Sequence, residues 1–257
     1  MATRSRRVFC LMATIMATIV YSGVVAESPV PVVLWHGMGD SCCFSFSLGQ
    51  IRTILEEHLP GVYVKSVKIG DSLVKDVENS YFKNVNDQVR EVCEELENDK
   101  MLSDGFNAIG FSQGAQFLQC FTYRVVQNHL VQAEYWHDPL NEDVYKQNSI
   151  FLADINNERN VNKTYIENLT RLKNFVLVKF DKDTMVQPVE TEWFGFYSPG
   201  QAVQTEKLED SAIYKEDRLG LADLQKSGRL HFLAVDANHL QFTDEWFVSD
   251  IISGFLK

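Results

Sequence analysis

The chain has 257 residues, of which 45% are hydrophobic and 23% charged, and its formal net charge is −11 at neutral pH. This length suffices for one domain with a sizeable hydrophobic core. The acidic balance argues against nucleic acid, and against an anionic membrane surface, as the main partner. After the first 26 residues no segment is long and apolar enough to span a bilayer, so we expect no stable membrane anchor.

Residues 1–26 have the layout of a cleaved secretory signal. The basic start MATRSRR is followed by an apolar stretch from about Val8 to Val20 and by small residues up to Ala26. The apolar run is too short for a membrane anchor, and no stop-transfer pattern follows it. Cleavage after Ala26 would remove three of 24 basic and none of 35 acidic residues, leaving residues 27–257 with a net charge of about −14 (21 minus 35).

Sequons and cysteines fit passage through the secretory pathway. Asn162 and Asn168 lie in N-x-T sequons and are candidate glycosylation sites. Four cysteines remain after cleavage: Cys42, Cys43, Cys93 and Cys120. The first two are adjacent and could form a vicinal disulfide or stay reduced, and the other two could bridge if their helices touch. No cysteine spacing indicates a zinc site.

Apolar runs and helical patterns alternate along the chain. Five runs have the length of buried strands: residues 31–37, 62–67, 106–111, 175–180 and 231–235. They are too continuous for a one-sided antiparallel sheet and favour parallel strands. Helical spacing is found over 47–58, 81–98 and 243–256, the last with Thr243 as the expected N-cap. Residues 125–174 contain no strand pattern and predict a lid-like excursion or a plain surface insertion. We therefore predict one α/β domain with helices on both faces of a mostly parallel sheet.

The segment FNAIGFSQGAQFLQCF, residues 106–121, contains a candidate nucleophile. Gly110, Ser112 and Gly114 fit the G-x-S-x-G nucleophile elbow, in which the serine adopts a strained backbone at a strand-to-helix turn. The pattern alone is weak because glycine and serine are common residues. Its context strengthens it, since an apolar strand ends at Phe111 and an amphipathic helix begins directly afterwards. The alternative is an ordinary strand–turn–helix join.

A nucleophilic serine needs a histidine base and a carboxylate that orients the base, in the chain order Ser, acid, His for this fold. His239, in the loop DANHLQF after the last predicted strand, is the histidine that fits this order. Asp181 and Asp183 follow the strand at 175–180, and the sequence separates these two only weakly. Asp236 is close to His239 but is out of order.

The stretch WHGMGD, residues 35–40, follows the first predicted strand. Its glycines would let backbone N–H groups approach a developing oxyanion, and we expect Met38 to donate beside the N–H of Gln113. A plain glycine turn is the alternative.

Seven stretches together resemble the palmitoyl-protein thioesterase family, in particular its lysosomal type: VVLWHGMGDSCC, DVENSYFKNVNDQV, GFSQGAQFL, LVQAEYWHDP, SIFLADINNERNVN, EWFGFYSPGQA and DRLGL. The resemblance covers nearly all of the chain after the predicted signal. It implies an α/β-hydrolase fold and an enzyme that removes long fatty acyl groups, chiefly palmitate, from protein cysteines during lysosomal degradation. By resemblance Ser112 is the nucleophile, His239 the base and Asp183 the acid, with Met38 and Gln113 as oxyanion donors.

The chain departs from that family after the stretch FLQCFTYR. The family continues there into another sheet strand and several dozen further residues, whereas here Arg124 is followed directly by Val125. We therefore expect a shortened variant that lacks one central strand and part of the acyl-binding lid. The family's partner for Cys93 also falls in the missing stretch, and Cys120 is a candidate substitute.

The leading hypothesis is a serine thioesterase without metal or cofactor. Its substrates would be S-palmitoylated proteins or peptides and fatty acyl thioesters, and it would act in the lysosome or be secreted. One alternative is a general carboxylester or lipid hydrolase with the same triad. The other is a catalytically impaired variant whose triad never assembles because a central strand is absent.

Overall fold

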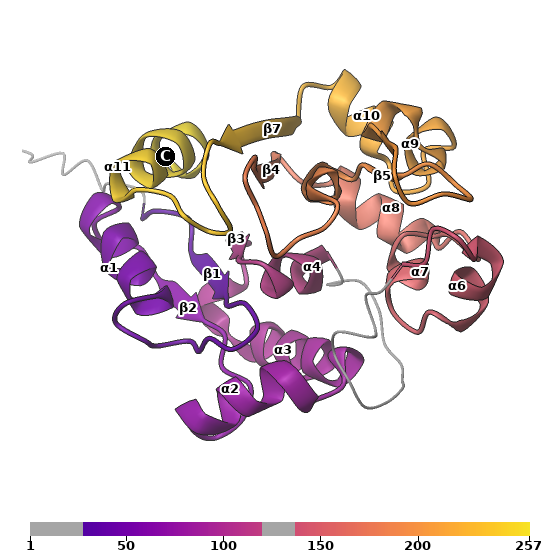
Figure 1. Cartoon of the computed structure of the whole chain (residues 1–257). Coiled ribbons are helices and arrows are strands. Elements are labelled where there is room, and N and C mark those ends of the chain that lie inside the picture. The colour runs from indigo at the N-terminus through magenta and orange to yellow at the C-terminus, as the bar shows by residue number, and fades with distance from the viewer. Residues whose placement is uncertain (1–27, 120–136) are drawn as a thin grey trace, which may run out of the picture.

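The computed structural model describes residues 28–119 and 137–257 (Figure 1). The predicted signal, Cys120, Arg124 and the start of the predicted excursion therefore lie outside the described residues. The described strands are β1 (Val32–Trp35), β2 (Val64–Ser66), β3 (Asn107–Gly110), β4 (Phe175–Phe180), β5 (Phe196–Tyr197), β6 (Thr205–Glu206) and β7 (Leu230–Val235). The five predicted strands are confirmed as β1, β2, β3, β4 and β7, with every boundary within two residues of the predicted one.

The strands form three sheets. In the first, β1 lies between β2 and β3 and is parallel to both; in the second, β4 is parallel to β7; β5 and β6 form a short antiparallel pair. In the described residues no strand joins β3 to β4. Within residues 28–119 and 137–257 the parallel strands therefore form two separate sheets, and the absence of a central strand between them stays a prediction.

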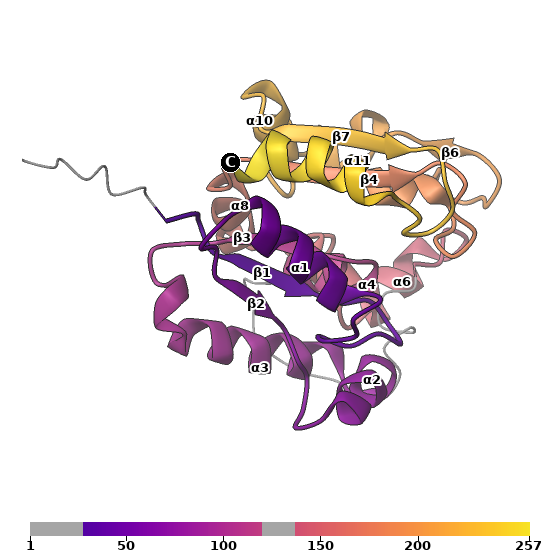
Figure 2. The same cartoon turned by 90° about the vertical axis from the view of Figure 1, so that its left-hand side faces the viewer.

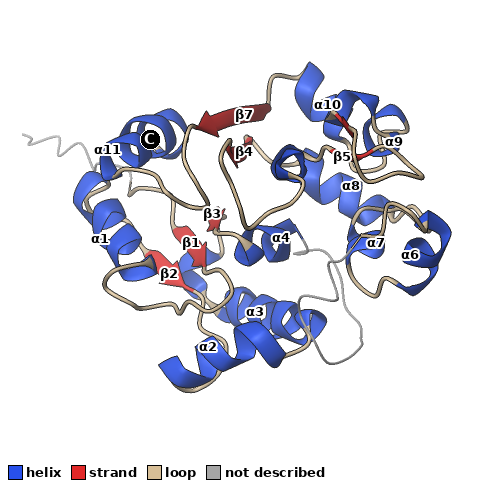
Figure 3. Ribbon diagram, in the orientation of Figure 1, coloured by secondary structure: helices blue, strands red, loops and turns tan. Residues whose placement is uncertain are grey.

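Helices and short helical turns fill the connections between the strands (Figure 3). The described α-helices are α1 (Leu48–His58), α2 (Leu73–Phe82), α3 (Val85–Asn98), α4 (Gln113–Gln119), α6 (Glu142–Asn148), α7 (Leu152–Ile155), α8 (Lys163–Thr170), α9 (Ala212–Lys215), α10 (Leu221–Lys226) and α11 (Asp244–Trp246). The same part of the chain also contains the 3₁₀ turns η1 (Lys100–Leu102), η2 (Val189–Trp193) and η3 (Leu208–Asp210) and the C-terminal π-helix η4 (Phe247–Leu256). In the described residues every helix is too short or too polar to cross a bilayer.

Alternate side chains of β1 build two separate cores, because successive strand residues point to opposite faces. Val32 and Leu34 pack against α1 and the C-terminal helix η4, whereas Val33 and Trp35 pack against α3 and α4. All four are at most 1% exposed. The prediction of helices on both faces of a parallel sheet is thus confirmed for the first sheet. A third core, formed by leucines of α8, α10 and β7, supports the second sheet.

Helix boundaries follow local capping. The hydroxyl of Thr243 accepts the N–H of Trp246, which confirms Thr243 as the N-cap of α11. The prediction of one helix over 81–98 was wrong, because the chain is extended at Lys83 and the side chain of Asn84 caps a new helix, α3. The side chain of Asn84 accepts backbone N–H groups and so begins a new helix. The apolar residues on both sides keep helical spacing, and the spacing alone therefore does not show the break.

A cluster of aromatic rings links the two parallel sheets. Phe242, in the loop after β7, lies 6.4 Å between ring centroids from Phe111 at the end of β3 and 6.4 Å from Phe180 at the end of β4. It also contacts Trp246 and Phe247, at 5.8 and 5.7 Å, and so belongs to the core of the first sheet. Figure 2 shows β4 and β7 above β1 and β2. Each such aromatic pair contributes about 0.5–1.5 kcal/mol beyond its buried area.

We expect Phe242→Ala to lower the free energy of unfolding by about 2–4 kcal/mol, since it removes a partly buried ring with four aromatic neighbours. Urea unfolding followed by fluorescence would measure the change. Phe46→Ala is the matched control, because Phe46 is 77% exposed, and it should stay within about 0.5 kcal/mol of the parent. Equal losses in the two variants would contradict the linking role of Phe242.

Candidate active site

Ser112 occupies the turn between β3 and α4 in a strained backbone conformation. Its φ is 52°, in the left-handed region that non-glycine residues rarely adopt. A Cβ on Gly110 would come within 2.4 Å of Ala115 Cα, and one on Gly114 within 2.3 Å of the carbonyl oxygen of Trp35. Both glycines are therefore required by close backbone packing. This is the geometry of the predicted nucleophile elbow.

Three side chains from distant parts of the sequence meet at this turn. His239 Nδ1 donates a hydrogen bond to Asp183 Oδ2, and Ser112 Oγ lies 3.0 Å from His239 Nε2. Because the carboxylate can only accept, Nδ1 carries the proton and Nε2 is left as the acceptor for the serine hydroxyl. The structure thus brings together Ser112, His239 and Asp183, in the arrangement that a serine nucleophile needs.

Asp183 is held as a carboxylate by its surroundings. Burial alone would raise its pKa, but hydrogen bonds from the N–H groups of Val186 and Met185 and from His239 outweigh burial and lower the pKa. The two N–H groups donate to Asp183 Oδ1 at 2.9 and 2.6 Å, which leaves Oδ2 directed at the imidazole. An ionised, fixed acid can orient His239 and stabilise its protonated form.

The other acidic candidates lie elsewhere. Asp181 pairs with Lys179 at 3.0 Å and Asp236 with Lys182 at 2.8 Å, both as ion pairs. Of the three aspartates that the sequence analysis considered, Asp183 is the one whose carboxylate contacts His239.

The loop after β1 passes close to the serine. A Cβ on Gly37 would lie 3.1 Å from Ser112 Cβ, so residues 36–40 run directly beside the nucleophile. Met38, in this loop, is 36% exposed. Gln113 is the first residue of α4, and the first N–H groups of a helix have no partner within it. Of the two predicted oxyanion donors, Met38 thus follows the glycine that packs against Ser112, and Gln113 follows Ser112 itself at the start of α4.

Asp76, on α2, fixes this loop and was not identified from the sequence. It is fully buried and accepts four hydrogen bonds. Oδ1 accepts from His36 Nε2 at 3.0 Å and from the N–H of Ile69 at 2.6 Å; Oδ2 accepts from Ser41 Oγ at 2.8 Å and from the N–H of Cys42 at 2.9 Å. Both ends of the loop are thus tied to one carboxylate.

His36 and Asp76 form a buried ion pair. His36 Nδ1 donates to the carbonyl of Gly37 and Nε2 to Asp76, so both ring nitrogens are donors, as in an imidazolium. Burial alone would lower the pKa of His36, but the hydrogen bond and charge of Asp76 outweigh it and raise the pKa. Burial likewise opposes ionisation of Asp76, yet His36 and the backbone donors lower its pKa. The pair stabilises the folded loop while His36 stays protonated and Asp76 ionised.

Ser80, one turn after Asp76 on the same buried face of α2, is a second residue that the sequence reasoning missed. Its hydroxyl accepts the N–H of Gly39 at 2.8 Å, and its carbonyl accepts the side-chain amide of Gln113 at 3.1 Å. Ser80 therefore connects the loop beside the serine to the start of α4. The only signal in the sequence was the stretch DVENSY, which contributed to the family resemblance without assigning these roles.

Glu192, in the turn η2, is a third such residue. One of its carboxyl oxygens accepts the N–H of Phe180 at 2.8 Å. An oxygen of each acid and a ring nitrogen of His239 lie within 4.8 Å of one another. Burial, followed by the neighbouring charge of Asp183 and the hydrogen bond to it, raises the pKa of Glu192 to about 7 although the N–H of Phe180 opposes the shift.

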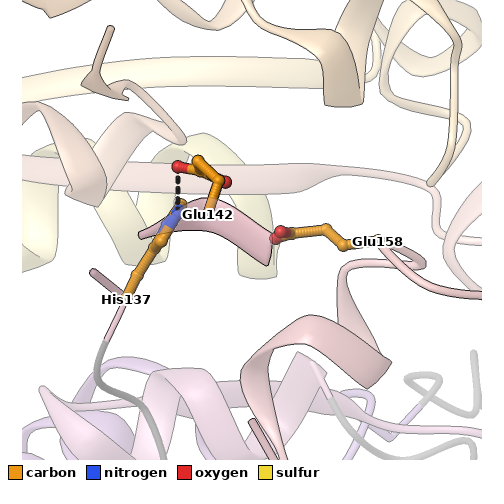
Figure 4. A group of neighbouring side chains, drawn as sticks. All are labelled: His137, Glu142 and Glu158. Carbon is orange, nitrogen blue, oxygen red and sulfur yellow. Dashed lines mark hydrogen bonds and ion pairs between the residues drawn. The ribbon is translucent and has the colours of Figure 1, made fainter. Parts of the chain in front are cut away.

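The remaining histidines of the described residues have local partners. His58 contacts the carbonyl of Ile54, and His231 contacts the side chain of Asn174. His137 belongs to a separate cluster with Glu142 and Glu158 (Figure 4). His129 lies outside the described residues.

The cluster of His137, Glu142 and Glu158 connects elements of the helical region. His137 Nε2 bonds Glu142 at 2.7 Å, and its ring stacks between Tyr145 and Phe196 at 3.9 and 4.0 Å between centroids. Glu158 accepts from the hydroxyl of Tyr145 at 3.1 Å. Since these groups satisfy one another, the cluster needs no ligand to explain it, and it fastens α6 to β5.

The cysteines and sequons are placed as follows. Cys42 and Cys43 form a vicinal disulfide directly after the loop that Asp76 holds. Cys93, on α3, is a free thiol and Cys120 lies outside the described residues, so the structure gives no support for a bridge between them. Asn162 caps α8 and Asn168 lies in its last turn; both are partly exposed, and their glycosylation stays a prediction.

The parallel strands, the helices on both faces and the serine at a strand-to-helix turn define an α/β hydrolase. The chain matches a family model described as palmitoyl protein thioesterase over residues 31–121 and 118–239, and it belongs to that family. It is 41% identical to palmitoyl-protein thioesterase 1 of Caenorhabditis elegans over 295 aligned positions, which cover 97% of this chain and 99% of that protein.

Two other relatives support the same assignment. Palmitoyl-protein thioesterase 3 of Dictyostelium discoideum is 30% identical over 287 positions, covering 95% of this chain and 97% of that protein. A human protein named as a lysosomal thioesterase is 34% identical over 98 positions, which cover 37% of this chain and 32% of that protein. The homologues support a thioester hydrolase that depalmitoylates proteins.

We expect Asp76→Asn to reduce both stability and the reactivity of Ser112. The side-chain amide would point an N–H₂ group at groups that now donate hydrogen bonds to the carboxylate. His36 would also lose its counter-charge. Together these changes should lower the free energy of unfolding by about 3–5 kcal/mol. Urea unfolding and labelling by a fluorophosphonate probe would measure the two effects. Asp71→Asn, an exposed change of the same charge shortly before α2, should leave both unchanged. A fully stable and reactive Asp76→Asn protein would show that the loop does not depend on this carboxylate.

Proposed function

We propose that this protein is a serine thioesterase in which Ser112, His239 and Asp183 remove palmitate and other long-chain fatty acyl groups from S-acylated cysteines of proteins. The observation that carries the proposal is the 3.0 Å distance between Ser112 Oγ and His239 Nε2, two side chains that are 127 residues apart and follow strands of different sheets. With Asp183 on the far side of the ring, the imidazole has the tautomer that accepts a serine proton.

In the first half of the reaction Ser112 Oγ attacks the thioester carbonyl while His239 Nε2 takes the hydroxyl proton. The imidazolium that forms is stabilised by the carboxylate of Asp183. The N–H groups of Met38 and Gln113 would bind the oxyanion, one from the loop that Asp76 and Ser80 fix and one from the start of α4. The intermediate collapses to an acyl-serine and expels the cysteine thiolate, which leaves readily and takes the proton from His239, so that the product is a thiol and the imidazole is neutral again.

In the second half a water molecule attacks the acyl-serine with His239 as general base. The tetrahedral intermediate breaks down to the free fatty acid and regenerates the Ser112 hydroxyl, which takes the proton back from His239. The overall reaction consumes one water and yields one carboxylic acid and one thiol. These steps need no metal or cofactor.

We place the activity in the lysosome, reached through the secretory pathway. The name of the human relative and the predicted signal at residues 1–26 support this location. The expected acidic surface suits an acidic compartment, because partial protonation of carboxylates relieves self-repulsion there.

We further propose that the chain is a shortened member of its family. An alignment of 295 positions with the nematode relative exceeds the 257 residues of this chain, so at least 38 positions (295 minus 257) have no residue here. The two parts of the family match meet at residues 118–121, close to Arg124. The split between β3 and β4 supports the same interpretation. Because Ser112 and His239 still meet, the geometry favours an active variant over an impaired one.

We expect Ser112→Ala to abolish thioester hydrolysis, lowering kcat by about 10³-fold or more, while the unfolding transition stays close to that of the parent. Release of thiol from a palmitoyl-cysteine peptide would measure turnover. Ser66→Ala, at the end of β2, is a control that removes a hydroxyl elsewhere in the first sheet. Sustained turnover by the Ser112→Ala protein would refute the assignment of the nucleophile.

We also expect the protein to prefer thioesters to oxygen esters. Palmitoyl thioesters should be hydrolysed with a higher kcat/KM than oxygen esters of the same acyl chain, since a thiolate is the better leaving group. Paired assays with palmitoyl-thioester and palmitoyl-oxyester substrates would measure the ratio. A preference for the oxygen ester would favour a general carboxylester or lipid hydrolase with the same triad.

A further inference from the structure

The turn η2 places a second acid directly behind the proposed catalytic acid. Glu192 is partly buried beside the end of β4, and one of its carboxyl oxygens lies within 4.8 Å of a carboxyl oxygen of Asp183, whose side chain has no exposed surface. Two carboxyl groups in contact cannot both be ionised without strong repulsion, so one of them must hold a proton for the pair to persist. Which of the two holds it decides how this site works.

The hydrogen bonds assign the charge to Asp183. Asp183 accepts from two backbone N–H groups, of Met185 and Val186, and from His239, whereas Glu192 accepts one, from Phe180. Donors stabilise the charged form of a carboxyl group, so the acid with three donors is the carboxylate and the acid with one donor is the protonated partner. The directions of the two pKa shifts, lowered for Asp183 and raised for Glu192, agree with this assignment.

A neutral Glu192 uses both of its oxygens. One accepts the N–H of Phe180, the last residue of β4, and the carboxyl O–H is the donor available for the contact with Asp183. Asp183 then has hydrogen-bond partners on every side: two backbone amides, one imidazole and one carboxylic acid. Its rotation away from His239 would break several of these bonds at once.

We infer that Glu192 is a positioning residue of this site: in its neutral form it donates a hydrogen bond to Asp183 and holds that carboxylate against His239, and its ionisation disables the site. This inference rests on the proposed function, because it acts through the proposed acid and base. Glu192 would act on Ser112 only through Asp183 and His239.

Ionisation of Glu192 would release Asp183 from its position. Loss of the proton removes a donor from Asp183 and places a second negative charge against it, which favours rotation of one carboxylate. A rotated Asp183 no longer orients His239, so the attack by Ser112 slows as the pH rises through about 7, the pKa of Glu192.

The groups that face Glu192 shift its pKa in opposite directions. Asp183 and burial oppose ionisation of Glu192, whereas the positive charge of Lys179 on β4 favours it. Lys179 is divided between other partners, since it also pairs with Asp181 at 3.0 Å and lies 4.3 Å from the ring centroid of Trp193. Burial, the largest influence, together with the charge of Asp183 therefore raises the pKa of Glu192.

The same titration should affect folding stability. A carboxyl group whose pKa is raised in the folded state stays protonated while the unfolded chain ionises, so stability falls as the pH rises from the ordinary glutamate range toward about 7. Below that range both states are protonated, and the contribution of Glu192 is fully present. The inference thus predicts a site that works, and is most stable, on the acidic side of neutrality.

The test is the rate of fluorophosphonate labelling of Ser112 between about pH 4.5 and 9, because this probe reports the nucleophile whether or not a thioester is the natural substrate. Glu192→Gln is the informative variant: its amide supplies both an acceptor for Phe180 and a donor to Asp183, but it cannot ionise. Glu192→Ala supplies neither. Glu190→Gln, the same charge change in the same turn η2, is the matched control.

We expect labelling of the parent and of Glu190→Gln to decline about fivefold or more above pH 7, and Glu192→Gln to keep its acid-side rate without that decline. Glu192→Ala should be slower by about 10-fold to 100-fold at every pH. The fall in unfolding temperature from pH 5 to pH 7.5 should be smaller in Glu192→Gln than in the parent, which is a readout independent of activity.

The outcomes separate this inference from the proposed function. An alkaline decline in Glu192→Gln equal to that of the parent, or parent-like labelling of a folded Glu192→Ala, would overturn the role of Glu192 while leaving the nucleophile established. A parent protein that is folded but never labelled would overturn both. A merely structural role for Glu192 would lower stability in Glu192→Ala without moving the pH profile of Glu192→Gln.

Discussion

The contact of Phe242 with rings from both parallel sheets is the interaction on which the proposed site depends. In the described residues β3 and β4 are not joined by a strand, so backbone hydrogen bonds do not fix one sheet relative to the other. Phe242 follows β7 of the second sheet, yet it is packed in the hydrophobic core of the first. Apolar packing thus fixes the two sheets relative to each other, which the backbone hydrogen bonds of a connecting strand would otherwise do. Because His239 precedes Phe242 by only three residues, docking of this ring also brings the imidazole to Ser112.

Buried polar groups then set the fine geometry on each side of that contact. On the first sheet, Asp76 and Ser80 of α2 hold the loop beside the serine through side-chain and backbone hydrogen bonds. On the second, backbone amides and Glu192 surround Asp183. Each carboxylate is saturated with donors, which is the condition under which a buried charge becomes a rigid positioning element rather than a cost.

Much of this architecture could be predicted from the sequence. Continuous apolar runs marked all five strands of the parallel sheets, and the glycines at 110 and 114 marked the turn that presents Ser112, because both signals are local. Chain order singled out His239, but it could not separate Asp183 from Asp181, since that choice depends on which side chain points toward the loop after β7. The split of the predicted helix at 81–98 was missed because the cap at Asn84 interrupts the backbone without interrupting the apolar spacing. Asp76, Ser80 and Glu192 were missed for a different reason: a polar residue at helical or turn spacing looks solvent-exposed until tertiary contacts bury it.

The division of the sheet has a consequence for how the chemistry is distributed. Ser112, the proposed nucleophile, and the two proposed oxyanion donors belong to the sheet of β1 and β3, whereas His239 and Asp183, the proposed base and acid, follow strands of the sheet of β4 and β7. Under the proposed mechanism oxyanion stabilisation and proton transfer would therefore be carried out by different sheets, connected by the hydrogen bond from Ser112 to His239. A sliding of one half by about an ångström would leave the anion-binding loop intact and still stop proton transfer. Activity in such a molecule would depend on how the two sheets are positioned relative to each other, and not on either sheet alone.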